Sequence, residues 1–281
     1  MTKPAVANEQ IDPIQLEQQA NAARFHKALA RRNFLKNVGL AGAGIAAGSM
    51  LQGCLGGGTV SSQTVAQPDV LNFALNLEYL EAEFYNRAVT GNFLPASVTG
   101  GSGQITGGQK VTFATPRIAD IAQQILNDEI AHVKLLRSAL GSAAVPEPNI
   151  NLAALGIGFA NENEFLNLSR ALEDTGVSAY SGAATLLSDA NLQAAAQILA
   201  TEAYHAGNIR DNVIQRSIAA AKTDSLDVLP DEAHFFAVDS NGLAIKRTPS
   251  QVLAIVYAKA TPGTNSGGFF PNGVNGNIKT V

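Results

Sequence analysis

Four stretches of the chain repeat apolar residues every three or four positions, which is the spacing of one buried helix face. They cover residues 69–89, 116–140, 163–188 and 189–221. The second stretch has Thr115 as a cap and Pro116 at the first helical position, and glycine follows each of the first two. The pattern therefore predicts an all-α bundle of four helices.

The segments between these stretches differ in length and character. Residues 91–115 are rich in Gly and Thr, so we expect a long loop or a small hairpin there. Residues 142–161 contain two Gly and two Pro, which predicts a long crossover between helices two and three. In helix three, Gly176 leaves room for another backbone to approach.

The C-terminal part carries a different pattern. Residues 249–259 predict a short helix that begins at Thr248-Pro249, and the Gly/Asn-rich residues 261–281 predict an irregular tail. Because Phe269, Phe270 and Pro271 are apolar, we expect this tail to pack over the bundle. The expected organisation is a bundle at 69–222 followed by an extension at 223–281.

Composition narrows the possible functions. With 281 residues and 46% hydrophobic content, the chain can bury a substantial core. From Cys54 onward it carries 13 Lys+Arg against 20 Asp+Glu, a difference of −7, and it has no basic patch, which argues against nucleic-acid binding. No Gly-rich stretch has the Lys-Ser/Thr context of a phosphate-binding loop.

The N-terminus has the layout of an export signal. Ala30-Arg31-Arg32-Asn33-Phe34-Leu35-Lys36 precedes a Gly/Ala-rich apolar run from Val38 to Leu51, as in twin-arginine signals. Residues 1–53 therefore predict export by the twin-arginine machinery to the periplasm or cell envelope. An N-terminal anchor helix is the alternative, although the run is short for a membrane span.

Cys54 is the only cysteine, so the exported body has no internal disulfide. Leu51-Gln52-Gly53-Cys54 is similar to a bacterial lipobox, in which Cys54 would carry a lipid anchor. The alternative is a small residue in a discarded peptide. Residues 54–68 predict a flexible tether in either case.

Two Glu-x-x-His tetrads carry the candidate chemistry. Residues three apart share a helix face, so Glu129 with His132, and Glu202 with His205, can bind one metal ion together. Both tetrads fall on the apolar face of their helix, where ionisable groups are costly unless they are paired or bind metal. Each tetrad also follows an upstream Glu-x6-Tyr, and the four residues concerned are Glu78, Tyr85, Glu173 and Tyr180.

These segments resemble the bacterial ferritin-like family, which includes desiccation-related relatives. The resemblance is carried by residues 71–85, 127–132 and 202–207, and covers about 69–220. It implies a ferritin-like four-helix bundle in which Glu129 and Glu202 bridge two metal ions, with the remaining ligands being Glu78, His132, Glu173 and His205. Four carboxylates and two imidazoles suit two Fe or Mn ions, whereas zinc more often binds Cys or three His.

Several neighbours have open roles. Glu81 can replace or supplement Glu78, and Tyr85 and Tyr180 are either core aromatics or hydrogen-bond donors around the ligands. In some di-iron relatives an Asp in the position of Asp128 orients an opposing His, while the matching position before the second tetrad is Thr201. His234 is expected in a loop.

The expected function is that of an exported protein with a dinuclear Fe or Mn centre that reacts with oxygen or peroxide in envelope stress protection. A non-catalytic structural or desiccation-stress protein with a stabilising or vestigial site is the alternative. Iron storage is a third possibility, and a homo-oligomer stays open.

Overall fold

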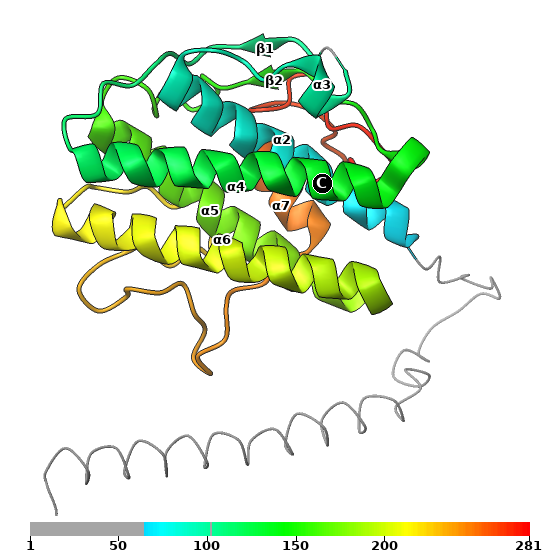
Figure 1. The fold of residues 1–281 in the computed structure, drawn as a ribbon. Helices are drawn as coiled ribbons and strands as arrows, with labels where there is room; N and C mark the ends of the chain where they lie inside the picture. The colour runs from blue at the N-terminus through cyan, green and yellow to red at the C-terminus, as the bar shows by residue number, and fades with distance from the viewer. Residues whose placement is uncertain (1–64, 102) are drawn as a thin grey trace, which may run out of the picture. The chain divides into compact units, whose positions relative to one another are not determined.

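The computed structural model describes residues 65–101 and 103–281. Four long helices, α2 (Gln67–Thr90), α4 (Pro116–Leu140), α5 (Glu162–Ala183) and α6 (Asp189–Gln215), pack as a bundle in which α2 lies along α4 and α5 lies along α6 (Figure 1). A long crossover joins α4 to α5, and the short helix α7 (Pro249–Val256) follows the bundle. The predicted all-α bundle with an irregular extension is confirmed.

Helix α2 is the central element, because all its residues from Val70 to Asn86 are buried. Other parts of the chain cover the side of α2 that faces away from the bundle. The Asn76 side chain binds the backbone of Asn275 in the C-terminal tail, and the Tyr79 hydroxyl donates to the carbonyl of Val145 in the crossover. The extension is therefore part of the core that holds α2.

The segment between α2 and α4 differs from the predicted loop or hairpin. It contains a short helix, α3 (Ala96–Thr99), and a strand, β1 (Ile105–Thr106). Strand β1 pairs in parallel with β2 (Ile150–Asn151) of the crossover, so the hairpin alternative was wrong. Two strands that are far apart in sequence leave no local turn signal by which their pairing can be recognised.

Helix boundaries shifted by a few residues. Helix α2 begins at Gln67, inside the expected tether; α5 ends at Ala183 and continues as the 3-10 turn Ala184–Leu186; and α6 ends at Gln215 rather than at 221. Helix α4 has the predicted bounds, but the Thr115 side chain does not cap it and instead binds the Glu162 carboxylate. Glu162 also pairs with Arg216, and this contact between helix ends takes the place of a local cap.

The extension is fastened to the bundle. Helix α7 begins with a capping box in which Thr248 and Gln251 bind each other's backbone amides. Phe269 and Phe270 are buried, as predicted, whereas Pro271 is exposed.

No helix in the described ranges is long and apolar enough to cross a membrane. The export signal at 1–53, Cys54 and most of the tether lie outside these ranges.

A pair of buried carboxyl groups, those of Glu83 and Glu147, lies between α2 and the crossover. Glu83 accepts a hydrogen bond from the amide of Leu94, and its charge acts on the nearby carboxyl of Glu147. Burial raises the pKa of Glu83 to about 7, and burial together with the Glu83 charge raises the pKa of Glu147 to about 9. At neutral pH the pair therefore holds a proton.

Because both folded-state pKa values lie above the unfolded value, these groups favour the fold at low pH, and that contribution is lost as the pH rises through 7 to 9. Glu147→Gln, which stays neutral, is expected to reduce the fall in Tm between pH 7 and 9 by at least about 2–4 °C, or about 1 kcal/mol. Thermal melts of both proteins at several pH values check this. Asp120→Asn, at an exposed position on α4, is the control, and parallel pH profiles for wild type and Glu147→Gln would contradict the prediction.

Candidate metal centre

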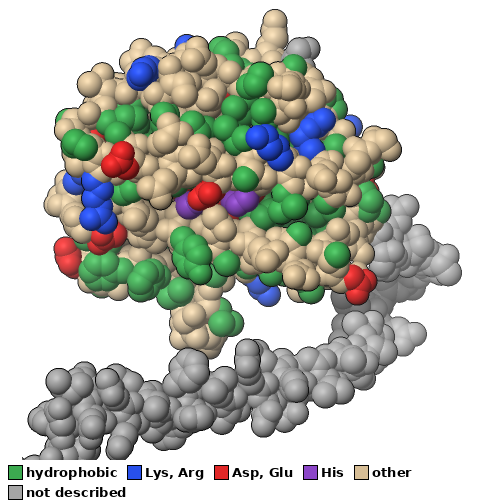
Figure 2. Space-filling view, in the orientation of Figure 1, with side chains coloured by type: hydrophobic (Ala, Val, Ile, Leu, Met, Phe, Trp, Pro, Cys, Tyr) green, Lys and Arg blue, Asp and Glu red, His purple; other side chains and the backbone are tan. Residues whose placement is uncertain are grey.

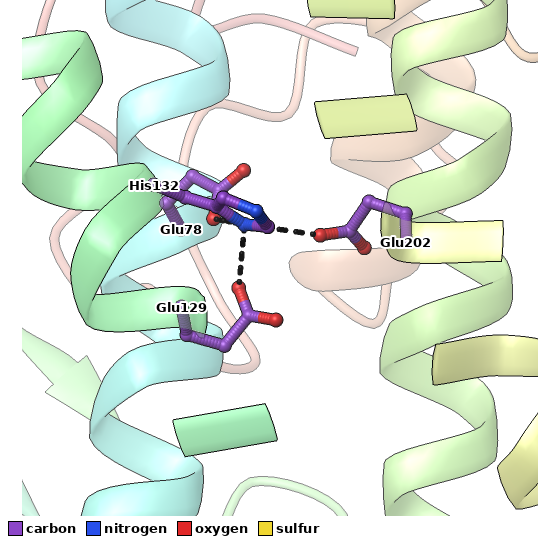
Figure 3. Close-up of side chains that lie close together, drawn as sticks. All are labelled: Glu78, Glu129, His132 and Glu202. Carbon is purple, nitrogen blue, oxygen red and sulfur yellow. Dashed lines mark hydrogen bonds and ion pairs between the residues drawn. The ribbon is translucent and has the colours of Figure 1, made fainter. Parts of the chain in front are cut away.

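The predicted ligands come together in the middle of the bundle, and each long helix contributes. Helices α2 and α5 supply one carboxylate each, and α4 and α6 supply one carboxylate and one imidazole each, from side chains that are all buried: Glu78, Glu129, His132, Glu173, Glu202 and His205. The i, i+3 spacing places each Glu one turn before its His on the same inward face. Figure 3 shows four of these side chains converging from α2, α4 and α6.

The six residues form two overlapping groups. In one, Nδ1 of His132 lies 3.2 Å from Glu78 Oε2. The same nitrogen lies 3.4 Å from an oxygen of Glu129 and 3.5 Å from an oxygen of Glu202. In the other, Nδ1 of His205 lies 3.1 Å from Glu129 Oε1 and 3.3 Å from Glu173 Oε2. Glu129 and Glu202 belong to both groups, whose potential ligand atoms lie within 4.8 Å of one another.

Several potential ligand atoms are better placed to bind a cation than to form hydrogen bonds with each other. Despite the short distances, Nδ1 of His205 and both carboxylate oxygens of Glu129 and of Glu202 have no hydrogen-bond partner. Buried polar atoms are rarely left unpaired, because desolvation of each costs about 1–3 kcal/mol. Four carboxylates against two imidazoles also leave an excess of negative charge, which two divalent ions would balance.

The pKa shifts have the same physical origin. Burial alone would lower the pKa of His205, but the carboxylates of Glu173 and Glu129 outweigh it and raise that pKa to about 12. Burial and the charge of Glu129 raise the pKa of Glu202 well above its usual range. Both shifts favour added positive charge, as protons or as metal ions.

The two Glu-x6-Tyr motifs brace each other across the bundle. Tyr85 on α2 donates a hydrogen bond to Glu173 on α5, and Tyr180 on α5 donates one to Glu78 on α2. The remaining oxygen of each Glu faces a histidine. Of the two roles left open for the tyrosines, the hydrogen-bonding one matches this arrangement, since each O–H fixes the orientation of a candidate ligand.

Sequence comparison places this geometry in a family. The protein-family model described as "Ferritin-like domain" matches residues 66–215, which is more than half of the chain. The chain belongs to the ferritin-like domain family. No curated protein matches it significantly. The family match covers all four long helices of the bundle, and so includes every side chain of the candidate centre.

Within this ferritin-like centre, Glu81 and Gly176 occupy one corner. Glu81 is buried, and burial followed by the charges of four neighbouring glutamates raises its pKa well above the usual range. It belongs to neither ligand group. A Cβ on Gly176 would overlap the Glu202 carboxylate and lie 3.2 Å from Glu81 Oε1. This glycine therefore makes room for side-chain carboxyls, and the expectation that it makes room for another backbone was wrong.

The surroundings of the two histidines are unequal. Nε2 of His205 lies 3.1 Å from Oδ2 of Asp128 on the opposing helix α4, with its Nδ1 turned to the carboxylates. The corresponding position for His132 is Thr201, and the closest contacts of His132 with carboxylates in the described ranges are all made through Nδ1. An Asp on the outer nitrogen fixes the tautomer and raises the basicity of the inner one.

If each of the two groups binds one metal ion, this asymmetry predicts unequal affinities for the two ions. Asp128→Ala is expected to weaken binding of the ion next to His205 by about 10–100-fold while the other ion is retained. Titration of the metal-loaded protein with a chelator, following release of each equivalent, measures the two affinities separately. Thr201→Ala is the matched control on the other side. Unchanged release of both ions from Asp128→Ala would contradict the prediction.

A hollow on the surface leads towards the centre. It encloses about 220 Å³ between α4 and α6 and includes Asp128, Tyr204 and His205 in its lining. Figure 2 shows histidine and acidic side chains reaching the surface near the middle of this face. Since the imidazole edges are the least buried part of the centre, small molecules can approach the ligands from this side.

Two residues outside the predicted set complete the description. Ser169 shares a hydrogen bond with the Tyr85 hydroxyl and was missed, although it lies one helical turn before Glu173 and the i, i+4 spacing indicates a common face. His234 lies in an exposed loop beside Asp231 and belongs to neither ligand group.

Proposed function

We propose that this ferritin-like protein binds two Fe or Mn ions and reacts with oxygen or peroxide. The observation that carries the proposal is the pair of buried ligand groups that share Glu129 and Glu202. When bound, two redox-active ions supply electrons to, or accept them from, a small oxidant. Carboxylate and imidazole ligands of this kind suit ions that change valence.

The chain's own residues would hold and orient such a centre. Glu129 and Glu202 belong to both groups and would help to hold both ions, while Glu78 with His132 would hold one ion and Glu173 with His205 the other. The hydroxyl of Tyr85 binds one oxygen of Glu173, and the hydroxyl of Tyr180 binds one oxygen of Glu78. The other oxygen of each carboxylate is therefore directed inward. The core around α2 and α5 excludes water from the rest of the site.

The proposed setting is the cell envelope. Export by the twin-arginine machinery, which carries folded proteins, would let the metals bind before transport. A lipid on Cys54 would then hold the protein at the membrane surface. The support for this setting is the Arg31-Arg32 segment and the residues around Cys54 in the sequence.

Elemental analysis of protein purified without chelators tests the proposal first. We expect about two Fe or Mn per chain, and consumption of peroxide or oxygen by the loaded protein. Glu129→Ala and His205→Ala are each expected to lose metal while helical circular dichroism is retained. His234→Ala, a histidine in an exposed loop, is the control and should keep full metal content.

The alternatives give different results. If metal raises Tm but no oxidant is consumed, the site is a stabilising one, as in the structural or desiccation-stress hypothesis. Iron in large excess over two per chain, in a closed shell, would indicate storage. Full metal content in both Glu129→Ala and His205→Ala would overturn the ligand assignment.

A further inference from the structure

Residues 235–245, here called the Phe hairpin, expose an apolar surface that neither the bundle nor the metal centre explains. Phe236 is 67% exposed and Leu243 is 63% exposed, and Phe235 and Val238 are also exposed. Its two arms are joined by an isolated antiparallel bridge between Val238 and Ala244. Exposed apolar side chains gathered in one segment commonly mark an interaction site.

The Phe hairpin is held in place by its own hydrogen bonds. At the tip, the Asp239 carboxylate accepts from the amides of Asn241 and Leu243. At the base, the buried Arg210 guanidinium donates to the carbonyls of His234 and Phe235 and pairs with Asp174. The apolar side chains are therefore presented on an ordered support, so little conformational entropy is lost when they bind a partner.

A second surface has the complementary character. A cavity of about 560 Å³ lies between the first half of α5, the end of α7 and residues 221–223. Its volume falls within the roughly 300–1,000 Å³ of pockets that hold ligands. Its lining is largely apolar, with two lysines that form no ion pair in the described ranges: Leu155, Ile157, Ala254, Ile255, Lys222 and Lys259.

Charge matches the two surfaces to each other. The Phe hairpin and the turn before it carry Asp231, Glu232 and Asp239, whereas the cavity carries Lys222 and Lys259. The surfaces are also neighbours on one chain, because Arg170 of the cavity and Arg210 at the hairpin base both contact Asp174. A patch that contains both a projection and its complement can pair with itself across a two-fold axis.

We propose that two copies of this chain form a two-fold dimer in which the Phe hairpin of each copy occupies the cavity of the other. Burial of Phe236 and Leu243 supplies the main stabilisation, since large apolar anchors dominate interfaces of this kind. The acidic residues of the hairpin and the lysines of the cavity select the orientation. The dimer does not depend on metal.

Sedimentation velocity of the full chain over a wide concentration range tests the dimer. Wild type is expected to sediment as a dimer. The double variant Phe236→Ser/Leu243→Ser is expected to raise the dimer Kd at least about tenfold, with unchanged helical content. Leu135→Ser, at an exposed leucine of α4, is the control and should leave Kd unchanged. A wild type that stays monomeric would overturn the proposal.

Charge reversal tests the orientation. Glu232→Lys and Lys259→Glu are each expected to weaken the dimer, and the two together should restore much of the lost affinity if these charges meet across the interface. A dimer unaffected by both the apolar and the charge variants would place the interface elsewhere and overturn the assignment. A monomer that binds neutral phosphatidylcholine vesicles through Phe236 would also overturn it and indicate a lipid surface as the partner.

Discussion

Replacing Gly176 with alanine is expected to remove at least one of the two metal ions while the bundle stays folded. The new Cβ would overlap a carboxylate oxygen of Glu202 and lie 3.2 Å from the Glu202 carboxyl carbon. Glu202 is fully buried and belongs to both ligand groups, so its carboxylate has little room to move without leaving its position between them. One added methyl group would then displace a shared ligand.

Loss of metal is not what a glycine-to-alanine change in a helix usually causes. Alanine stabilises a helix interior by about 0.8–1.0 kcal/mol relative to glycine, so Gly176→Ala without the close contact would be a mild stabilising change. We expect instead a fall from about two metal ions per chain to one or none, with a normal helical spectrum. Elemental analysis and circular dichroism on the same sample measure both quantities.

Gly207 provides a matched control. It is also a helical glycine, on α6 close to His205, but a Cβ there would meet no atom within 4 Å. Gly207→Ala is expected to keep both ions and to gain up to about 1 kcal/mol of stability. If Gly176→Ala retains full metal content, the shared position of Glu202 between the two groups is wrong.

The second large effect is on stability. Arg210→Met is expected to lower the free energy of unfolding by about 3–5 kcal/mol, the range for breaking a buried ion pair from one side. Arg210 is only 1% exposed, pairs with Asp174 at 2.7 Å and donates to the carbonyls of Val228, His234 and Phe235. Methionine fills the volume but leaves these buried acceptors without a donor.

Denaturant unfolding, followed by circular dichroism, measures this loss. Arg216→Met is the control, because Arg216 is partly exposed and its ion pair with Glu162 is expected to contribute at most about 1 kcal/mol. Since Arg210 holds the segment after α6 and not the ligands, folded Arg210→Met should still bind metal. Equal losses for the two arginines would contradict the prediction.

The buried arginine network and the ligand cluster differ in how their charges are balanced. The network of Arg170, Asp174, Arg210 and Asp227 satisfies its charges internally, so it works as a structural brace between α5, α6 and the extension. The ligand cluster leaves several ligand atoms without a hydrogen-bond partner and brings four carboxyl groups together with only two imidazoles. Removing one partner of a buried ion pair destabilises the fold, whereas buried acidic groups without a protein partner favour the binding of protons or metal ions.

The sequence by itself determined the four helices, their inward faces and the candidate ligands that each of these faces carries. Those features are local: helical period, the i, i+3 spacing of each Glu-x-x-His tetrad, and the seven-residue spacing of each Glu-x6-Tyr all lie within one helix. A pattern of this kind can be recognised in one segment without knowledge of which other segments pack against that helix. The same local reading found α7 and its cap at Thr248.

Only the tertiary structure decided how these residues are shared and braced. Tyr85 reaches Glu173 and Tyr180 reaches Glu78 across separations of 88 and 102 residues, and β1 pairs with β2 across 45 residues, from Ile105 to Ile150. The neighbours of Gly176 and the Glu83–Glu147 pair also come from separate segments. Such contacts depend on how whole helices pack, and a period within one helix carries no information about its partner.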